Sequence, residues 1–262
     1  MTLDAATIES LAEHLERAEL EVHDVTKITD DKPHLDWEDA YAIQYAIRRR
    51  KEARGHRIVG LKAGLTSHAK MKQMGVATPV FGFLADYFAV ADGGEIDRSR
   101  LIHPKVEPEI AFMTKAALYG PGCHIGAVLA ATDFVVPALE IIDSRYRDFK
   151  FDLKSVVADN CSSSRFVVGG IPTPIAGLDL RTLGLVMEKN GVQVALGAGA
   201  AVLGHPAASV AMLANMLAAR GEHIPAGTLI LTGGITEAVA MERGDAVSLR
   251  IQTLGCVSAR FQ

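Results

Sequence analysis

The residues best suited to chemistry in this sequence are two glutamates, Glu107 and Glu109, which are separated by one residue. In an extended strand both carboxylates would point to one face, while Val106, Ile110 and Phe112 would point to the other. Two like charges side by side on a half-buried strand are costly unless a cation neutralises them, and a divalent cation with oxygen ligands does so directly. The pair therefore indicates half of a metal site, although a solvent-facing strand edge, where charges are common, explains it equally well.

A third carboxylate favours the metal site. Glu140 lies between Leu139 and Ile141 in an apolar run, where an ionised carboxylate needs a counter-charge. Asp143 would point the other way in the same strand, and Arg145 is a ready partner for it. Three carboxylates without a histidine or a thiolate favour Mg²⁺ or Mn²⁺ over Zn²⁺, with water or substrate oxygens completing an octahedron.

Three other polar residues have two interpretations each. Lys62 lies in an apolar predicted strand, where it either extends to solvent or pairs with a carboxylate, and the residues alone favour the first. Arg145 either pairs with Asp143 or grips a substrate carboxylate. His103 either supports a glutamate or, as loop histidines more commonly do, bonds to the backbone.

Composition excludes several classes of protein. The net charge of the 262 residues is −4, and the basic run over 48–54 closes a predicted helix, where it complements the helix dipole rather than binding nucleic acid. Three cysteines without metal-ligand spacing predict a reducing compartment and no disulfides. The N-terminus lacks an apolar secretory core, and no uncharged apolar stretch is long enough to span a bilayer. We therefore expect a cytoplasmic protein with neither a membrane nor a nucleic acid as partner.

Hydrophobic periodicity and turn residues predict an α+β protein, with a helical N-terminal region over 1–56 and a strand-rich catalytic domain over 57–262. Asn190-Gly191 predicts a type I′ hairpin turn. A helix over 67–74 has the makings of a lid that excludes water, although a fixed surface helix explains it almost as well. Further predicted helices cover 5–20, 36–55 and 206–221, and predicted strands cover 57–61, 87–90, 106–113, 135–142, 156–168, 184–188, 192–196, 228–232, 246–254 and 256–261.

Two glycine-containing stretches have ordinary explanations. Residues 197–204 lack the third glycine of a dinucleotide-binding loop, because Val202 stands in its place, so close backbone packing or a pocket-lining loop explains them better. Gly233 and the residues over 234–236 could offer backbone N–H donors to a ligand carboxylate, but a plain turn is the commoner outcome.

Several motifs, taken together, extend over nearly the whole chain. In this combination and order they resemble the family of 2-keto-4-pentenoate hydratases and 4-oxalocrotonate decarboxylases, within the fumarylacetoacetate hydrolase superfamily. The motifs are Gly-Leu-Lys-Ala-Gly-Leu-Thr-Ser over 60–67, His-Pro-Lys-Val-Glu-Pro-Glu over 103–109, Glu-Ile-Ile-Asp-Ser-Arg over 140–145, Ala-Asp-Asn-Cys-Ser-Ser over 158–163 and the glycine stretch over 197–204.

The resemblance implies a mixed β-sheet roll with a helical N-terminal region, and a Mg²⁺ or Mn²⁺ site at Glu107, Glu109 and Glu140. It reverses the interpretation of Lys62, because the lysine of this motif lines the pocket and would act as a catalytic and substrate-binding cation. Asp86 would orient Lys62 or cap the next strand. The substrate-binding residues would be Lys62, Arg145, Ser162, Ser163 and His205, and the two serines lack the nearby base that a nucleophile needs.

The branch of the family is a finer question. Segments 66–88, 142–152 and 203–206 favour the decarboxylases, since hydratases commonly carry Asn or Ser where His205 stands. The implied activity is decarboxylation of 2-oxohex-3-enedioate to 2-hydroxypenta-2,4-dienoate and CO₂ in meta-cleavage degradation of aromatic compounds, with hydration of that dienol as the alternative. The implied partners are a small 2-oxo dicarboxylic acid and the cognate hydratase. A non-catalytic, metal-stabilised binding module is an alternative of another class.

Overall fold

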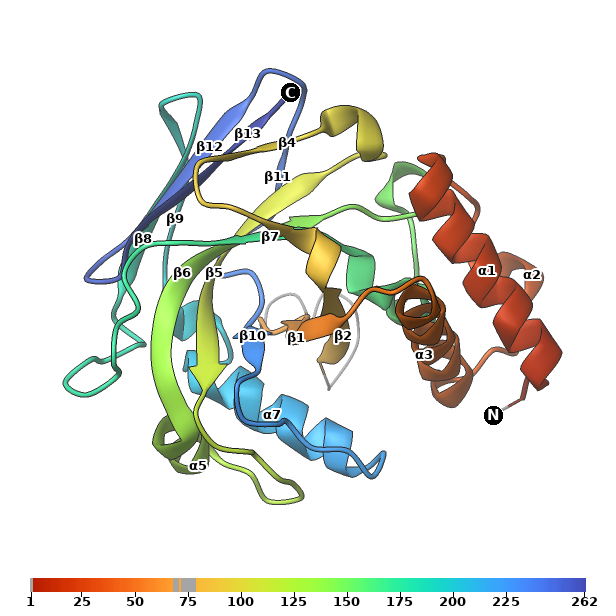
Figure 1. The fold of residues 1–262 in the computed structure, drawn as a ribbon, viewed down its shortest axis with the longest axis horizontal. Helices are drawn as coiled ribbons and strands as arrows, with labels where there is room; N and C mark the ends of the chain where they lie inside the picture. Colours follow the sequence, from red (N-terminus) through yellow and green to blue (C-terminus); the bar gives the residue numbers. More distant parts are fainter. Residues whose placement is uncertain (1, 68–70, 72–78) are drawn as a thin grey trace.

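Two curled β-sheets form the body of the molecule, and a group of N-terminal helices lies against one side of it (Figure 1). This computed structural model describes residues 2–67, 71 and 79–262. The predicted helix over 67–74, with its lid role, therefore falls largely outside the described residues. The α+β class and the helical N-terminal region are confirmed.

Helix caps account for the N-terminal region. The side chain of Asp4 accepts a hydrogen bond from the backbone of Thr7, and Asp36 and Asp39 form a reciprocal capping box. The two long helices contact each other through buried apolar residues, and the second of them also contacts the rest of the molecule. The N-terminal region is therefore part of the hydrophobic core. The helices are α1 (Ala5–Glu21), α2 (Ile28–Asp31) and α3 (Trp37–Ala53), of which the first and third were predicted.

The larger sheet contains the two longest strands, β5 and β6, as antiparallel neighbours, and its β1 runs parallel to β10. Its order is β2 (Val80–Ala85), β1 (Ile58–Gly64), β10 (Leu229–Leu231), β5 (Lys105–Thr114), β6 (Thr132–Ile142), β7 (Ser163–Val168) and β3 (Ala89–Val90), with β11 (Val239–Ala240) also paired to β5. The smaller sheet runs β4 (Gly94–Ile96), β13 (Gly255–Phe261), β12 (Ala246–Ile251), β8 (Gly184–Lys189) and β9 (Val192–Ala198).

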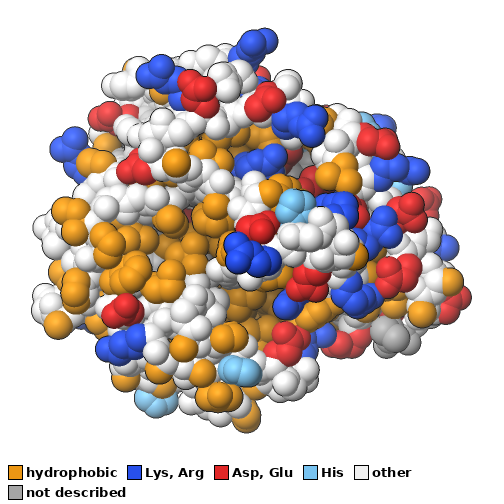
Figure 2. Space-filling model, viewed as in Figure 1, with side chains coloured by type: hydrophobic (Ala, Val, Ile, Leu, Met, Phe, Trp, Pro, Cys, Tyr) orange, Lys and Arg blue, Asp and Glu red, His pale blue; other side chains and the backbone are white. Residues whose placement is uncertain are grey.

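The predicted hairpin is confirmed as β8 and β9, joined by Asn190 and Gly191 with φ of 55° and 76°. Strand β9 is the edge of its sheet and carries exposed apolar side chains at Val192, Val194 and Leu196. Hydrophobic side chains gather on this side of the molecule (Figure 2). An edge strand with such a surface is suited to association with another protein.

Two predicted strands differ from the structure. The run over 156–168 begins as a helix, α6 (Leu153–Ala158), because Asp152 caps it by accepting hydrogen bonds from the backbone of Lys154 and Ser155. A short 3₁₀ helix, η4 (Asn160–Ser162), then leads into β7. The segment over 87–90 is likewise shorter as a strand, because η1 (Asp86–Phe88) precedes β3. Strand β2, which was not predicted, is buried throughout, and continuous apolar runs lack the alternation that identifies a strand.

The expectation that no uncharged apolar stretch is long enough to span a bilayer is wrong by length and composition. Among the described residues, the helical segment Gly199–Ala218 is long and apolar enough to do so, and half of it is buried in the molecule. Its main part is α7 (Pro206–Ala218), which packs Val210, Leu213 and Leu217 into the hydrophobic core. The apolar composition of this segment is therefore that of a core helix. The other helices of the described residues are α5 (Ile125–Ala131), η2 (Arg98–Arg100), η3 (Arg147–Phe149) and η5 (Gly199–Ala201).

Candidate metal centre and adjoining cavity

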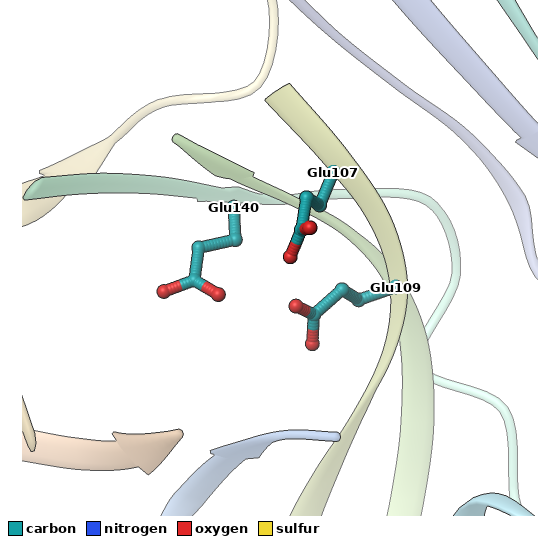
Figure 3. A group of neighbouring side chains, drawn as sticks. All are labelled: Glu107, Glu109 and Glu140. Atoms are coloured by element: carbon teal, nitrogen blue, oxygen red, sulfur yellow. The ribbon is translucent and has the colours of Figure 1, made fainter. Parts of the chain in front are cut away.

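Strands β5 and β6 bring three glutamates together. Glu107 lies directly opposite Glu140 in the antiparallel register, and Glu109 follows two residues along β5 on the same face. One oxygen atom from each carboxylate lies within 4.8 Å of the others. The three side chains converge on a common space beside the two strands (Figure 3). Glu109 and Glu140 are completely buried and Glu107 is half-buried.

The cluster is electrostatically costly as a set of bare carboxylates. Burial and the neighbouring carboxylates of Glu140 and Glu107 raise the pKa of Glu109 well above its usual value, and burial also raises the pKa of Glu140. Oε2 of Glu109 accepts a hydrogen bond from the backbone of Gly233 at 2.6 Å. Oε1 of Glu109 and Oε2 of Glu140 are buried without a hydrogen-bond partner among the described residues. A hard divalent cation fits this donor set, because it would satisfy these oxygens and offset the repulsion.

Lys62 on β1 completes the charged group. Its side chain is 4% exposed, and Nζ lies 2.9 Å from Oε1 of Glu140 and 3.1 Å from the backbone carbonyl of Cys161. Burial alone would lower the pKa of Lys62, but Glu140, Cys161 and Glu107 together outweigh burial and raise the pKa above its usual value. The residue-based preference for an ammonium group extended to solvent is therefore wrong, since this lysine is a buried cation beside the carboxylate cluster.

A strained turn holds the carbonyl that Lys62 contacts. The consecutive residues Asn160, Cys161 and Ser162 have φ of 48°, 52° and 59°. This is a left-handed backbone conformation that residues other than glycine rarely adopt. The Asn160 amide secures the turn by bonding to both backbone groups of Phe83, at 2.9 and 3.0 Å. Gly82 leaves room for the Asn160 side chain, because a Cβ at position 82 would lie 2.7 Å from Oδ1 of Asn160. Sequence reasoning missed Asn160, although asparagine tolerates this conformation better than most residues.

A cavity of about 440 Å³ opens beside the cluster. Its polar lining includes Lys62, Glu107 and Ser162, and Oγ of Ser162 is buried without a hydrogen-bond partner among the described residues. The hydroxyl is thus available to a ligand. The apolar lining includes Leu65, Val80, Ile142, Phe149, Phe151, Leu153 and Val156.

Arg145 does not pair with the carboxylate of Asp143, and it does not line the cavity formed by the described residues. Its guanidinium forms a buried ion pair with Asp159 and donates to the backbone carbonyls of Asp143 and Ser163 at 2.7 and 3.1 Å. The Asp143 carboxylate instead accepts from the backbone of Ile102 and His103. Arg145 pairs with Asp159 and not with Asp143 because α6 and η4 bring Asp159 back to Arg145.

Replacing Arg145 by methionine is expected to destabilise the fold by about 3–5 kcal/mol, because it leaves the Asp159 carboxylate buried without its partner. Arg147→Met is the matched control, since its ion pair with Asp24 is exposed and should contribute about 0–1 kcal/mol. Urea unfolding of both variants measures the difference. Equal midpoints for the two variants would contradict the structural role of Arg145.

Asp86 also lies elsewhere than expected. Its carboxylate accepts hydrogen bonds from the backbone of Arg57 and Tyr87 and lies 3.1 Å from Nδ1 of His56. The β1–β2 register places Gly82, and not Asp86, opposite Lys62. The interpretation in which Asp86 orients Lys62 is therefore wrong, and its role is to secure the end of β2.

The predicted histidines and Ser163 have local roles. His205 caps α7 by accepting from the backbone of Ala207 at 3.0 Å, and it is not among the described residues that line the cavity, which corrects its placement as a substrate ligand. The His103 ring packs against Phe149, with 4.8 Å between ring centroids, rather than against a glutamate. Ser163 begins β7, and its buried Oγ has no hydrogen-bond partner among the described residues.

Comparisons with known proteins identify the family to which this chain is similar. The family described as fumarylacetoacetate (FAA) hydrolase C-terminal matches residues 57–262. The chain is 66% identical over 260 residues to a 4-oxalocrotonate decarboxylase from Pseudomonas sp. (strain CF600), covering 99% of this chain and 98% of the relative. It is 40% identical to a 2-hydroxyhexa-2,4-dienoate hydratase from Comamonas testosteroni, covering 98% of each. A solved structure of 4-oxalocrotonate decarboxylase from Pseudomonas putida G7, complexed with magnesium and adipate, superposes with a TM-score of 0.98 at 64% identity, covering 100% of this chain and 99% of that one.

Proposed function

Because this chain belongs to the fumarylacetoacetate (FAA) hydrolase C-terminal family, we propose that it catalyses the metal-dependent decarboxylation of 2-oxohex-3-enedioate (4-oxalocrotonate) in meta-cleavage degradation of aromatic compounds. The observation that carries this function is the near-complete identity of fold and the high sequence identity to 4-oxalocrotonate decarboxylases. A small dicarboxylate as ligand and a divalent metal as cofactor accord with the magnesium and adipate of the solved relative.

The substrate is a vinylogous β-keto acid, which defines what the site must do. As the C5–C6 bond breaks, its electron pair forms a C4–C5 double bond, the C3–C4 π electrons move to C2–C3, and the C2 carbonyl oxygen becomes negative. C6 leaves as CO₂, and one proton on the C2 oxygen gives 2-hydroxypenta-2,4-dienoate. When bound, Mg²⁺ or Mn²⁺ supplies Lewis-acid stabilisation of the charge that develops on that oxygen.

In this proposal Glu107, Glu109 and Glu140 hold the cation, and the other polar groups act on the substrate. Lys62 directs a protonated Nζ at the developing C2 oxygenate, where a buried cation stabilises negative charge most effectively. Ser162 donates a hydrogen bond to the chelating end of the substrate from its hydroxyl, which has no partner among the described residues. Its neighbour Ser163 also has a hydroxyl without a partner in the described part of the chain.

The apolar wall also favours decarboxylation. The side chains of Phe149, Phe151, Leu153 and Val156 form part of the cavity lining. A carboxylate that turns into neutral CO₂ loses its hydration, so surroundings that hydrate it poorly favour the bond-breaking step. A hydratase, by contrast, must admit and position a water molecule. The apolar lining therefore supports the decarboxylase over the hydratase.

Product analysis tests the assignment directly. Purified protein with Mg²⁺ is incubated separately with 2-oxohex-3-enedioate and with 2-hydroxypenta-2,4-dienoate. We expect CO₂ release from the diacid and little conversion of the dienol. Formation of 4-hydroxy-2-oxopentanoate from the dienol, without CO₂ release from the diacid, would assign the chain to the hydratases. Inertness toward both, together with failure to bind oxalate, would indicate the non-catalytic metal-stabilised module, whose metal is closed to ligands.

We further propose a complex with the cognate hydratase. The dienol product reverts to its keto form in water, so direct transfer to the next enzyme preserves it. The exposed apolar residues Val192, Val194 and Leu196 on edge strand β9 offer a surface on which a related fold could pair pseudo-symmetrically. Co-purification of the two enzymes should fail for the Val194→Lys and Leu196→Lys double variant while CO₂ release persists. Co-purification unchanged by both substitutions would exclude this surface.

The division of the chain and its location are parts of the same proposal. Residues 1–56 form a helical region and 57–262 a catalytic domain, which is supported by the family match beginning at residue 57. A cytoplasmic location is consistent with the three free thiols, Cys123, Cys161 and Cys256.

A further inference from the structure

We infer that Lys105 binds the distal, C6 carboxylate of the substrate and thereby distinguishes the six-carbon diacid from its five-carbon product. The inference rests on the proposed function, because it assigns the second end of the same substrate. Lys105 lines the cavity and is half-buried. It is a specificity-determining residue in this role and not a participant in bond breaking.

Strand β5 places the relevant groups in a row. Lys105, Glu107 and Glu109 alternate along the strand, so all three side chains belong to the same face. Alternate residues on an antiparallel strand are about 6.8 Å apart. Glu109 is completely buried, Glu107 is half-buried, and Lys105 lies at the start of the strand. A chain of six carbons chelated at the glutamate end can therefore extend its far carboxylate toward Lys105.

The charge of Lys105 is uncommitted in the part of the chain that the structure describes. Lys62 pairs with Glu140 at 2.9 Å, whereas Lys105 has no carboxylate within ion-pair distance among those residues. Nζ of Lys105 instead lies 4.1 Å from the centroid of the Phe149 ring. Glu237, an exposed residue, is the other acidic residue besides Glu107 in the described lining. A substrate carboxylate would thus supply the anion that Lys105 lacks.

The Phe149 ring packs against the rings of His103 and Phe151. Asp148 and Phe149 both have a positive φ, of 56° and 58°, which is costly for residues other than glycine. The ring lines the cavity, with Lys105 over one face and His103 packed nearby. A cation over an aromatic face keeps its position at modest cost. Lys105 is therefore oriented before the substrate arrives.

The direction of the effect on catalysis follows from where the charge moves. The C6 carboxylate is negative in the substrate and becomes neutral CO₂, so an ion pair at C6 stabilises the substrate more than the transition state. Lys105 should therefore lower KM without raising kcat. The dienol product has lost this carboxylate and is bound through its chelating end alone, which favours its release.

The experiment compares two ligands that differ in one end group. Binding of 2-oxohexanedioate and 2-oxohexanoate to the Mg²⁺-loaded protein is measured by calorimetry for the wild type, Lys105→Met and Lys150→Met. Lys150 is the matched control, because it lies next to Phe149 and is exposed but is not among the described lining residues. Oxalate binding to each variant reports that the fold and metal site are intact.

We expect the wild type and Lys150→Met to prefer the diacid by on the order of 10- to 100-fold, and Lys105→Met to bind both ligands alike. With 2-oxohex-3-enedioate, Lys105→Met should raise KM by a similar factor while kcat is unchanged or higher, because the lost ion pair stabilised the substrate more than the transition state. A diacid preference retained in Lys105→Met would overturn the inference. Because the binding arm needs no turnover, diacid selectivity without CO₂ release would refute the proposed function and leave the role of Lys105 standing.

Discussion

Glu109→Gln is expected to abolish tight Mg²⁺ binding and to lower CO₂ release by about 10³-fold or more. The variant keeps the shape of the side chain but removes an anionic oxygen from a cluster whose three carboxylates lie within 4.8 Å of each other. Lewis-acid stabilisation of a developing charge amounts to several kcal/mol, and each 1.36 kcal/mol is about tenfold in rate. Glu107→Gln and Glu140→Gln should act in the same direction.

Calorimetric titration with Mg²⁺ and thermal unfolding with and without the metal measure the effect. The metal-free Glu109→Gln protein should be at least as stable as the metal-free wild type, because one of the mutually repelling carboxylates is gone. Glu188→Gln, on the exposed side of β8, is the control and should leave Mg²⁺ affinity unchanged. Undiminished Mg²⁺ affinity in all three cluster variants would contradict the assignment of these glutamates as metal ligands.

In the Mg²⁺-loaded protein, where the cation would still offset the charge of Glu140, Lys62→Met is expected to preserve the fold and metal binding but to lower kcat by on the order of 10²-fold or more. The ammonium group meets the C2 oxygen as it becomes negative, so its contribution is larger in the transition state than in the bound substrate. Single-turnover measurement of CO₂ release separates this step from binding and product release.

The charge-matched control is Lys115→Met, which removes an exposed lysine just beyond the end of β5 and should leave kcat unchanged. Calorimetry with oxalate shows whether the chelating end of a ligand still binds to Lys62→Met. An unchanged kcat in Lys62→Met would leave this lysine a structural counter-ion of Glu140 only.

Local patterns were sufficient where the physics is local. The Glu107–Glu109 spacing placed both carboxylates on one face because strand side chains alternate, and the buried, apolar surroundings of Glu140 called for a counter-charge. The cap at Asp36 and the turn at Asn190-Gly191 were predictable for the same reason, since each depends on a few neighbouring residues.

Tertiary structure decided which residues meet across the chain. The β5–β6 register set Glu140 opposite Glu107, and the β1–β2 register set Gly82, and not Asp86, opposite Lys62. A one-residue slip in either register would have reversed these faces, and local sequence does not specify register. The ion pair of Arg145 with Asp159 likewise depends on how the chain folds back between the two residues.

The choice between α6 and a strand lay beyond the apolar pattern alone, although the cap at Asp152 is a local signal for the helix. The apolar run over 156–168 suits either a strand or a helix, and the cap at Asp152 and the left-handed turn from Asn160 to Ser162 settled it. That turn brings Asp159 to Arg145 and the Cys161 carbonyl to Lys62. The sequence by itself determined which residues could bind a metal or a substrate, because chemistry belongs to residue types. Only the folded chain decided which of them share the cavity, because long-range pairing sets those distances.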